Sequence, residues 1–253
     1  MNIKKFDEMN VVETVTFEVK NPSILVGVPD VGLVGPIAVS HIVQSLNMVE
    51  LGYIESDLLP PIIVIHKNEP KPQIRIFGSG EIIAVVTETI LSPQAIQHLS
   101  KTVTLWAKEY NAKFIVGITG IAIPNRLEVE KPTVYGVGST EDTRKLLQEA
   151  KIPPFEEGIL VGAYALLIKE CMKEKQPNIT LLAEAHLQFP DPGAAASTIE
   201  SLNTLLGTNI EVKSLLEKEE EIRIKARELM RRTREQMRSL QKVQEQELRG
   251  IYV

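Results

Sequence analysis

The sequence predicts an α/β protein with two parts: a three-layer αβα globular domain with a mostly parallel sheet, and a long C-terminal helical arm. Short apolar, β-branched runs alternate with helix-like runs over the first 209 residues. These apolar runs are nearly continuous, which is typical of strands covered on both faces. Residues 211–248 contain neither Gly nor Pro and consist mainly of strong helix formers. We therefore divide the chain into an α/β domain (1–209), an extended charged helix (210–249) and a short C-terminal segment (250–253).

Turn and capping signals bound the elements of the α/β domain. "QIRIFG" alternates apolar and polar residues, and the Gly-Ser-Gly turn at 78–80 predicts an antiparallel hairpin with the next strand. Ser92 before Pro93, and Asp191 before Pro192, are N-cap residues ahead of a proline at the first helical position. Strands are expected over residues 23–28, 61–66, 81–88, 113–120 and 133–139. Helices are expected over residues 36–46, 92–110, 141–150, 158–173 and 194–206.

The composition excludes several classes of protein. The chain has 253 residues, of which 43% are hydrophobic and 24% charged, and these are ordinary values for a globular protein. It has no run of about eighteen apolar residues, so no membrane span is expected. The N-terminal residues lack the apolar stretch of a signal peptide, and the single cysteine, Cys171, has no disulfide partner within the chain. We expect a cytoplasmic protein that does not bind membranes.

No residue set typical of a metal or catalytic site emerges. The four histidines, His41, His66, His98 and His186, are scattered without the spacing of metal ligands. The chain has no G-x-S-x-G motif, and Cys171 has no neighbouring base in the sequence. We expect no metal, no cofactor and no enzymatic activity, although residues distant in sequence can also assemble an active site.

The segment "GVPDVGLVGPIA" joins a strand to a helix, which is where phosphate-binding loops occur. Its glycines, Gly27, Gly32 and Gly35, do not match G-x-G-x-x-G, and no Lys-Ser/Thr pair follows them. One interpretation is that they permit a tight turn and close helix packing, and this one is favoured. The other is that they hold a phosphate or ribose. It gives the alternative function, a small-molecule enzyme of nucleoside-phosphorylase type that also uses the glycine turn at 117–120.

The C-terminal arm carries charges of both signs. Residues 211–249 contain eleven Lys and Arg against nine Glu, a net charge of +2 in a chain whose net charge is −5. A nucleic-acid-binding arm is normally one-sidedly basic, so we expect a solvated helix and no nucleic-acid partner. At 1.5 Å per residue this helix would be about 57 Å long. Leu215, Ile222 and Leu229 recur every seven residues, but the second apolar position of each heptad, which a coiled coil needs, is missing. We expect the base of the arm to pack on a neighbouring surface and its tip to be solvated.

The chain ends on "RGIYV", an apolar segment after a highly charged stretch. Gly250 is expected to end the helix, as glycine does at C-terminal caps. Three interpretations of Ile251, Tyr252 and Val253 are open: they fold onto the core, they fray without structure, or they are held out for a partner. A long charged helix before them favours the third interpretation.

Three segments resemble the proteasome-assembling chaperone family, especially its archaeal homologues. They are "GVPDVGLVGPIAVSHIVQSL", "EEGILVGAYALLI" and "FPDPGAAASTIESLNTLLG", and the resemblance extends over roughly residues 10–210. The terminal "IYV" is similar to the hydrophobic–Tyr–X C-terminus of proteasome activators and some assembly chaperones. The resemblance implies an ATP-independent chaperone or activator of the proteasome. The long arm departs from members whose tail lies close to the globular domain, and it leaves open whether the protein assembles α-rings, activates the finished particle, or does both.

In such proteins the tail docks into pockets between neighbouring α-subunits of the core particle. By this resemblance Ile251 would be the apolar anchor, Tyr252 would fix the tail through its ring and hydroxyl, and Val253 would supply a carboxylate that pairs with a lysine. Because three residues bind weakly, several tails on one body are needed, and we expect a homo-oligomer, with a tetramer favoured over a pentamer. A structural oligomer whose helices only join its subunits is the third interpretation.

Overall fold

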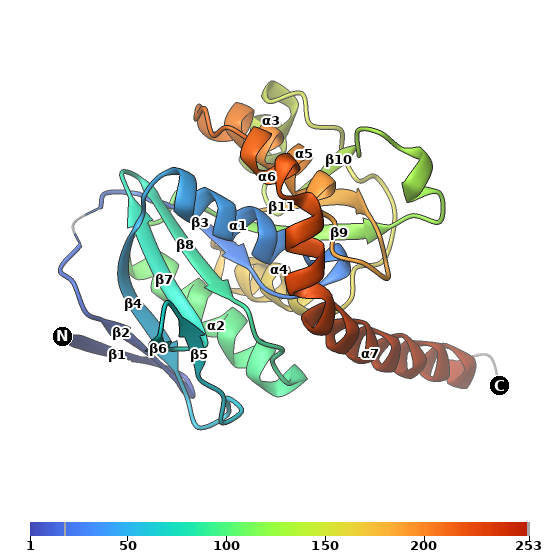
Figure 1. Ribbon diagram of the computed structural model, residues 1–253. Coiled ribbons are helices and arrows are strands. Elements are labelled where there is room, and N and C mark those ends of the chain that lie inside the picture. The colour runs from blue at the N-terminus through green and yellow to red at the C-terminus, as the bar shows by residue number, and fades with distance from the viewer. Residues whose placement is uncertain (18, 252–253) are drawn as a thin grey trace.

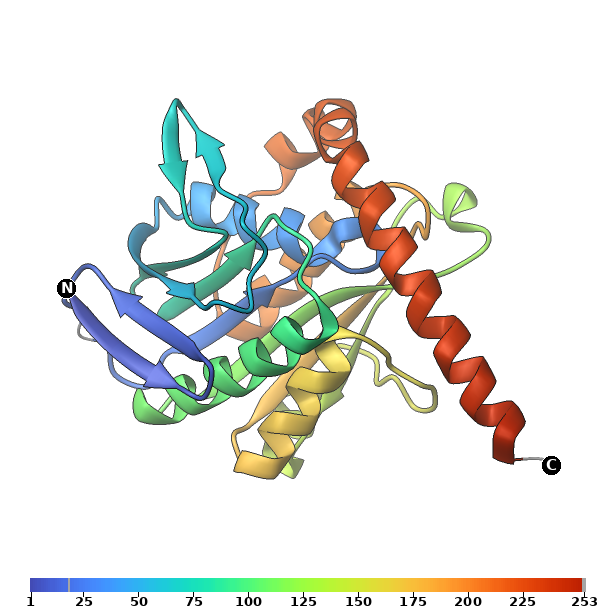
Figure 2. The same cartoon turned by 90° about the horizontal axis from the view of Figure 1, so that it is seen from below.

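A nine-stranded sheet forms the centre of the protein, in the order β1-β2-β4-β7-β8-β3-β9-β11-β10. The computed structural model describes residues 1–17 and 19–251, with side chains as far as Glu235. Two further strands, β5 and β6, form a separate hairpin that stands out from the body (Figures 1 and 2). The strands are β1 (Asn2–Phe6), β2 (Met9–Glu13), β3 (Ser23–Gly27), β4 (Val49–Glu55), β5 (Val64–His66), β6 (Glu69–Lys71), β7 (Ile74–Ser79), β8 (Ile82–Thr87), β9 (Phe114–Ala122), β10 (Val134–Gly138) and β11 (Asn178–Ala185).

Helices cover both faces of the sheet, so the predicted three-layer αβα architecture is confirmed (Figure 2). Neighbouring residues of one strand, Leu25 and Val26, belong to two different cores. Leu25 packs on the side of α1 and α5, and Val26 on the side of α2 and α4, which explains why the strands read as continuous apolar runs. The helices are η1 (Val31–Leu33), α1 (Val34–Ser45), α2 (Pro93–Glu109), η2 (Arg126–Glu128), α3 (Glu141–Glu149), α4 (Ala163–Glu174), α5 (Pro192–Leu206), α6 (Lys213–Glu217) and α7 (Glu219–Ile251).

The sheet is parallel at its centre and antiparallel on both sides. β3 pairs in parallel with β8 and with β9, and β9 pairs in parallel with β11. The other pairings in this sheet are antiparallel, so the predicted parallel strands form its central part and the whole sheet is mixed. The predicted hairpin is confirmed, because β7 and β8 pair from Ile74↔Thr87 to Ser79↔Ile82. Gly80 turns the chain between them with a φ of +56°.

The sequence patterns do not predict β1, β2, β4 or β11. In β11, Asn178 and Thr180 interrupt the apolar run, yet both side chains are fully buried and hydrogen bonded. The amide of Asn178 donates to the carbonyl oxygen of Ile115 at 3.1 Å, and the Thr180 hydroxyl donates to the Asn178 side chain at 3.0 Å. The run at 61–66 is only partly a strand, because β5 begins at Val64 and belongs to the separate hairpin.

In place of the one continuous helix expected over residues 210–249, the arm consists of two helices, α6 and α7, which are separated at Lys218. Three glutamates at 219–221 open α7, where negative charge stabilises a helix N-terminus. The prediction that Gly250 ends the helix is wrong, because α7 continues through Gly250 to Ile251. One glycine costs a helix only about 1 kcal/mol, which does not force it to end. α7 projects from the side of the body opposite the β1–β2 hairpin (Figures 1 and 2). Among the described residues, none of the helices is long and apolar enough to cross a membrane.

Candidate functional site

The glycines of the β3–α1 segment lie at the carboxyl ends of the parallel strands, where α1 packs directly on β3. A methyl group on Gly27 would lie 2.8 Å from the carbonyl oxygen of Gly35. Gly32 has a φ of +63°, a left-handed conformation that glycine adopts without a steric penalty. This geometry is what the packing interpretation requires: Gly27 and Gly35 permit the close contact, and Gly32 permits the turn.

The space beside these glycines is filled by the side chain of Tyr164, which comes from α4. A methyl group on Gly117 would lie 2.8 Å from its ring, and one on Gly35 would lie 2.6 Å from its hydroxyl. The hydroxyl accepts a hydrogen bond from the N–H of Val28 at 3.0 Å, and burial raises the pKa of Tyr164 far above its ordinary value. The pairing of β3 with β9 ends at Val26↔Gly117. Ligands of open α/β sheets bind beyond such strand ends, and here the protein's own tyrosine occupies that place.

Asp30 is a buried acid at the same edge of the sheet. Its side chain accepts hydrogen bonds from the N–H of Val31 and from the hydroxyl of Thr119 on β9, both at 2.9 Å. Burial raises the pKa of Asp30 to about 6, and the two donors, which favour the charged form, only partly oppose this effect. The carboxylate caps η1 and connects it to β9.

A buried ion pair between Arg126 and Asp191 joins two loops of this edge. The guanidinium of Arg126 donates to both carboxylate oxygens of Asp191, at 2.8 and 2.9 Å. Asp191 is fully buried and also accepts from the N–H of Ala194 at 2.9 Å, so its predicted role as an N-cap is confirmed. Arg126 was not predicted as its partner, because the two residues are 65 positions apart and no local pattern connects them.

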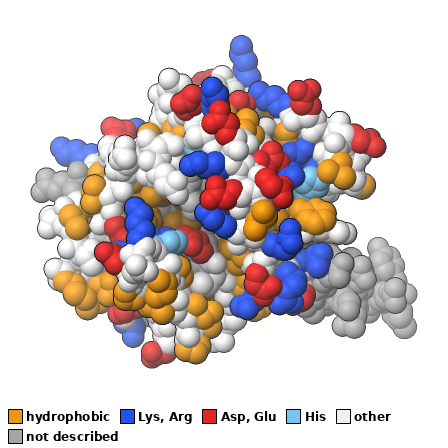
Figure 3. Space-filling view, viewed as in Figure 1, with side chains coloured by type: hydrophobic (Ala, Val, Ile, Leu, Met, Phe, Trp, Pro, Cys, Tyr) orange, Lys and Arg blue, Asp and Glu red, His pale blue; other side chains and the backbone are white. Residues whose placement is uncertain are grey.

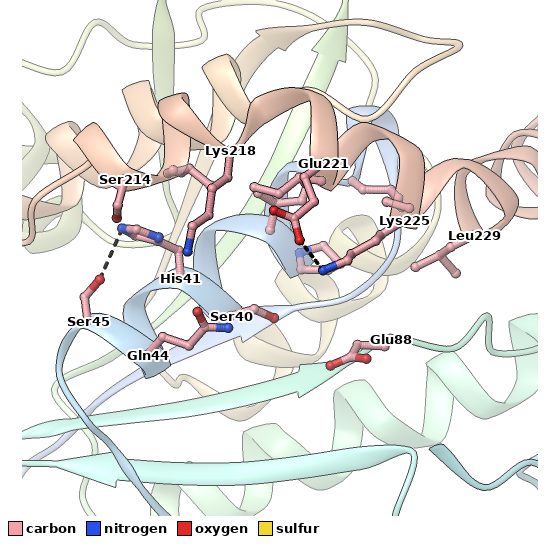
Figure 4. A pocket seen from close by; sticks show the side chains of 16 residues that line it. Ser40, His41, Gln44, Ser45, Glu88, Ser214, Lys218, Glu221, Lys225 and Leu229 are labelled. Atoms are coloured by element: carbon pink, nitrogen blue, oxygen red, sulfur yellow. Dashed lines mark hydrogen bonds and ion pairs between the residues drawn. The ribbon is translucent and has the colours of Figure 1, made fainter. Parts of the chain in front are cut away.

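A groove of about 690 Å³ lies between α1 and the base of the arm (Figure 4). This volume is within the range of small-molecule sites. Its apolar part comes from both walls, with Ile37 on α1 and Ile222 and Leu229 on α7. The residues that line it are Leu33, Pro36, Ile37, Ser40, His41, Gln44, Ser45, Glu88, Ser214, Leu215, Lys218, Glu221, Ile222, Lys225, Ala226 and Leu229.

One pair in this groove, His41 and Ser45, has the residue types of a base and a nucleophile. His41 Nε2 lies 3.1 Å from the Ser45 hydroxyl and 2.8 Å from the carbonyl oxygen of Glu211. Because a carbonyl oxygen can only accept, Nε2 carries the proton that is donated to Glu211. This nitrogen therefore cannot take a proton from Ser45, and the pair does not form a catalytic unit.

The base of the arm packs on a neighbouring surface, as predicted, and the structure shows that this surface is the α1–α5 side of the body. Met230 is only 1% exposed and belongs to the same core as Val31 and Leu33 of η1. Positive and negative side chains are mixed over this region (Figure 3). Ile251 is the last residue of α7, whereas Tyr252 and Val253 lie outside the described residues, so the C-terminal binding site stays a prediction.

The histidines are not gathered into a site. His66 pairs with Glu88, and His98 with Asp7, on different parts of the surface. Within the part of the chain that the structure describes, no group of three or more His, Cys, Asp or Glu could hold a metal ion.

Comparison with known proteins places this arrangement in a family. Residues 24–230 match the PAC2 family, a range that runs from β3 to the buried Met230 on α7. The chain belongs to the PAC2 family. The PAC2 match includes the glycine segment, Tyr164, the Arg126–Asp191 pair and the base of the arm, and it ends before the distal part of α7.

The PAC2 fold of this chain is similar to that of solved archaeal proteins. Pyrococcus furiosus PbaA, an archaeal homolog of proteasome-assembly chaperone, has a TM-score of 0.84 and 30% identity, over 90% of this chain and 99% of that one. Pyrococcus furiosus PbaB, an archaeal proteasome activator, has a TM-score of 0.73 and 21% identity, over 88% and 98%, a likeness that concerns the fold alone. The uncharacterized protein MJ0106 of Methanocaldococcus jannaschii is 30% identical over 225 residues, which are 88% of this chain and 91% of that protein.

Proposed function

We propose that this protein is an ATP-independent proteasome assembly chaperone, activator, or both, whose C-terminal tails dock into the pockets between core-particle α-subunits. The observation that carries the proposal is the likeness to PbaA, which covers nearly the whole of both chains. PbaA is an archaeal homolog of proteasome-assembly chaperone, and PbaB, of the same fold, is a proteasome activator. The cytoplasm, where we expect this protein, is where proteasomes work.

The arm supports the proposal because α7 leads the chain away from the body as far as Ile251 (Figures 1 and 2). Met230 and Thr233 are each 1% exposed and fix the base of α7. Beyond Glu235 the helix continues for sixteen residues to Ile251, or about 24 Å at 1.5 Å per residue. Ile251, Tyr252 and Val253 would be presented at its tip. The interpretation that they fold onto the core is disfavoured by this direction of α7 (Figures 1 and 2).

The alternative, an enzyme of nucleoside-phosphorylase type, would be favoured by a free Arg or His that faces the glycine turns. An arginine does lie at this edge, since a methyl group on Gly193 would be 2.9 Å from Arg126 Nη2. Its guanidinium is already bonded to Asp191 and to the carbonyl oxygen of Val129, however, and Arg126 is 7% exposed. With Tyr164 filling the adjoining space, these contacts support a binding function over an enzymatic one.

We further propose that several copies act together. Three residues at one tip offer a small contact, whereas tails joined on one body bind at a raised effective concentration. The expected assembly is a homo-oligomer, with a tetramer favoured over a pentamer. Light scattering and native mass spectrometry of the purified protein measure this number directly.

The experiment that tests the function compares the full chain with a chain that lacks the last three residues. Each is mixed with assembled core particles, and peptide hydrolysis is followed; each is also mixed with separate α-subunits, and ring formation is followed. We expect stimulation, ring assembly, or both with the full chain and neither with the truncated one. Equal behaviour of the two chains would exclude tail docking. The absence of both effects with the full chain would contradict the proposed function itself.

A further inference from the structure

The Arg126–Asp191 pair holds together three loops at the carboxyl edge of the parallel strands. Arg126 belongs to the β9–β10 loop, and Asp191 belongs to the β11–α5 loop. The backbone N–H of Asp191 donates to the carbonyl oxygen of Gly32 in η1, at 2.8 Å. The Asp191 carboxylate also accepts from the N–H of His186 at 3.0 Å. One buried residue thus fixes the β3–α1, β9–β10 and β11–α5 connections relative to each other.

The arm packs on η1, which lies in one of the connections that this pair fixes. Val31 and Leu33, on either side of Gly32, share a core with Met230 of α7. On the β11–α5 loop, burial lowers the pKa of His186, Asp191 raises it and Arg126 lowers it. Two charges on α7 have smaller effects: Arg223 lowers this pKa and Glu219 raises it. α7 thus lies against η1, whose Gly32 carbonyl oxygen is bonded to Asp191, and its charges lie near the β11–α5 loop that carries Asp191.

The energetics of a buried ion pair indicate that Arg126 and Asp191 contribute more to the relative orientation of their loops than to the free energy of unfolding. Replacing a buried ion pair by apolar residues is often neutral or stabilising, because both charges lose their hydration. A bidentate guanidinium–carboxylate contact nevertheless fixes the relative orientation of the two loops more closely than apolar packing does. Gly193 leaves the room for it, since a methyl group there would lie 2.9 Å from Arg126 Nη2.

We infer that the Arg126–Asp191 pair is a positioning element that sets the direction of the arm relative to the body. Arg126 and Asp191 act through η1 and the β11–α5 loop, and they touch no partner themselves. That the direction of the arm aims the C-terminal tail at its pocket rests on the proposed function. That the pair sets the direction of the arm does not depend on the proposed function, and it can be measured on the isolated protein.

The test measures distances between spin labels in the full chain with its tail intact. Cysteines replace Lys145 on α3 and Gln241 on the arm, and a second pair replaces Lys145 and Lys173 on α4 to report on the body alone. The native Cys171 is buried, and burial raises the pKa of its thiol to about 11, so it reacts slowly with the label. Labelled chains are diluted with unlabelled ones, so that each assembly carries one labelled copy.

Arg126→Met removes the guanidinium and leaves Asp191 bonded to the N–H groups of His186 and Ala194. We expect the arm-to-body distance distribution to broaden about twofold or to shift its maximum, as for a segment that has lost an ordering contact, while the body pair stays unchanged. Lys131→Met is the matched control, because Lys131 is a cation on the same loop whose ion pair, with Glu200, lies on the surface. It should leave both distributions as they are.

An unchanged arm distribution in folded Arg126→Met would overturn the inference. If that variant does not fold, Arg126→Met/Asp191→Asn replaces it, because it removes both buried charges and keeps a side-chain oxygen to cap α5. If the double variant also fails to fold, the pair serves the whole body and the inference is wrong.

Binding to core particles separates this inference from the proposed function. If the wild-type chain binds core particles, we expect a folded variant with a displaced arm to bind at least about tenfold more weakly, because its tails no longer match the spacing of the pockets. If the arm moves but the wild-type chain does not bind, the proposed function fails and the positioning role stands. If the wild-type chain binds and the arm of the variant does not move, the positioning role fails.

Discussion

The hydroxyl of Tyr164 occupies the position that a side chain on Gly35 would need, since a methyl group there would lie 2.6 Å from it. The two residues come from helices on opposite faces of the sheet, α4 and α1. They meet where β3 and β9 separate beyond Val26↔Gly117. The ligand crevice of an open α/β sheet is thereby converted into a junction between the two helix layers.

The first prediction follows from this contact. Gly35→Ala should lower the free energy of unfolding by about 1–3 kcal/mol, as overpacking of a core does, because the new methyl group also meets the carbonyl oxygen of Ile118. Denaturant unfolding measures the change. Gly80→Ala is the control: a methyl group there meets nothing within 4 Å, and only its left-handed backbone adds a cost of about 1–2 kcal/mol.

An unchanged free energy of unfolding in Gly35→Ala would contradict this packing role. Saturable binding of a nucleoside or phosphate ester by the wild-type chain, lost in Gly35→Ala, would restore the alternative function instead. Both measurements use the same purified proteins.

The second prediction concerns the pH dependence of stability through Asp30. The pKa of Asp30 is about 6 in the folded protein and about 3.9 in the unfolded chain, so the folded state binds more protons between these values. The contribution of Asp30 is therefore most favourable at low pH and is lost as the pH rises through 6, by an amount on the order of 3 kcal/mol.

Asp30→Asn removes this titration and keeps both hydrogen bonds, since the amide oxygen can accept from Val31 and the amide N–H can donate to Thr119. We expect the variant to be more stable than the wild-type chain at pH 7.5 and the difference to shrink towards pH 4. Thermal unfolding at a series of pH values measures it. Lower stability of Asp30→Asn at pH 7.5 would mean that the charged form of Asp30 is favourable.

The third prediction concerns the base of the arm. Met230→Ala should release α7 from the body, because truncating a buried Met costs about 2–5 kcal/mol. A loss of 2 kcal/mol corresponds to about thirtyfold faster amide exchange over residues 219–233. Ile224→Ala, on the same helix at a position that is 57% exposed, is the matched control and should exchange as the wild-type chain does. Equal exchange in the two variants would mean that Met230 does not hold the arm.

Periodicity and capping rules could predict much of this fold. The central strands and helices α1, α2, α3 and α5 follow from apolar runs and start signals, and the Ser92 and Asp191 caps are confirmed. The strand β11 could not be predicted, because Asn178 and Thr180 are polar residues whose burial is made possible by partners elsewhere in the chain. Patterns within one segment carry no information about such partners.

The same limit applies to the site. The glycines of the β3–α1 segment could be found in the sequence because a strand–turn–helix junction needs them. Tyr164, which fills the space beside them, could not, since it meets Val28 only in the folded chain, 136 positions away. Arg126 likewise meets Asp191 only in the folded chain, 65 positions away. Lys218 ends α6 without any glycine or proline, so helix formers alone could not locate the break in the arm.

The last prediction tests the C-terminal tail. If Tyr252 fills a pocket on the core particle, Tyr252→Ala removes a buried ring, and such anchors typically contribute at least about 2 kcal/mol, some thirtyfold in affinity per tail. Because several tails act together, the loss multiplies and stimulation should nearly vanish. Gln246→Ala, a change to a stronger helix former on the same arm, is the control and should bind as the wild-type chain does.

A second variant separates the ring from the carboxylate. One extra residue after Val253 keeps Tyr252 but moves the carboxylate away from the lysine that would pair with it, so it should impair binding almost as much. Thermal unfolding and oligomer size should stay unchanged in both variants, because Met230 and the rest of the described core are untouched. If Tyr252→Ala stimulates core particles as the wild-type chain does, the tail does not drive binding; if it unfolds the body, Tyr252 is part of the core. Only weakened binding with an intact body is consistent with a tail that is presented by the arm.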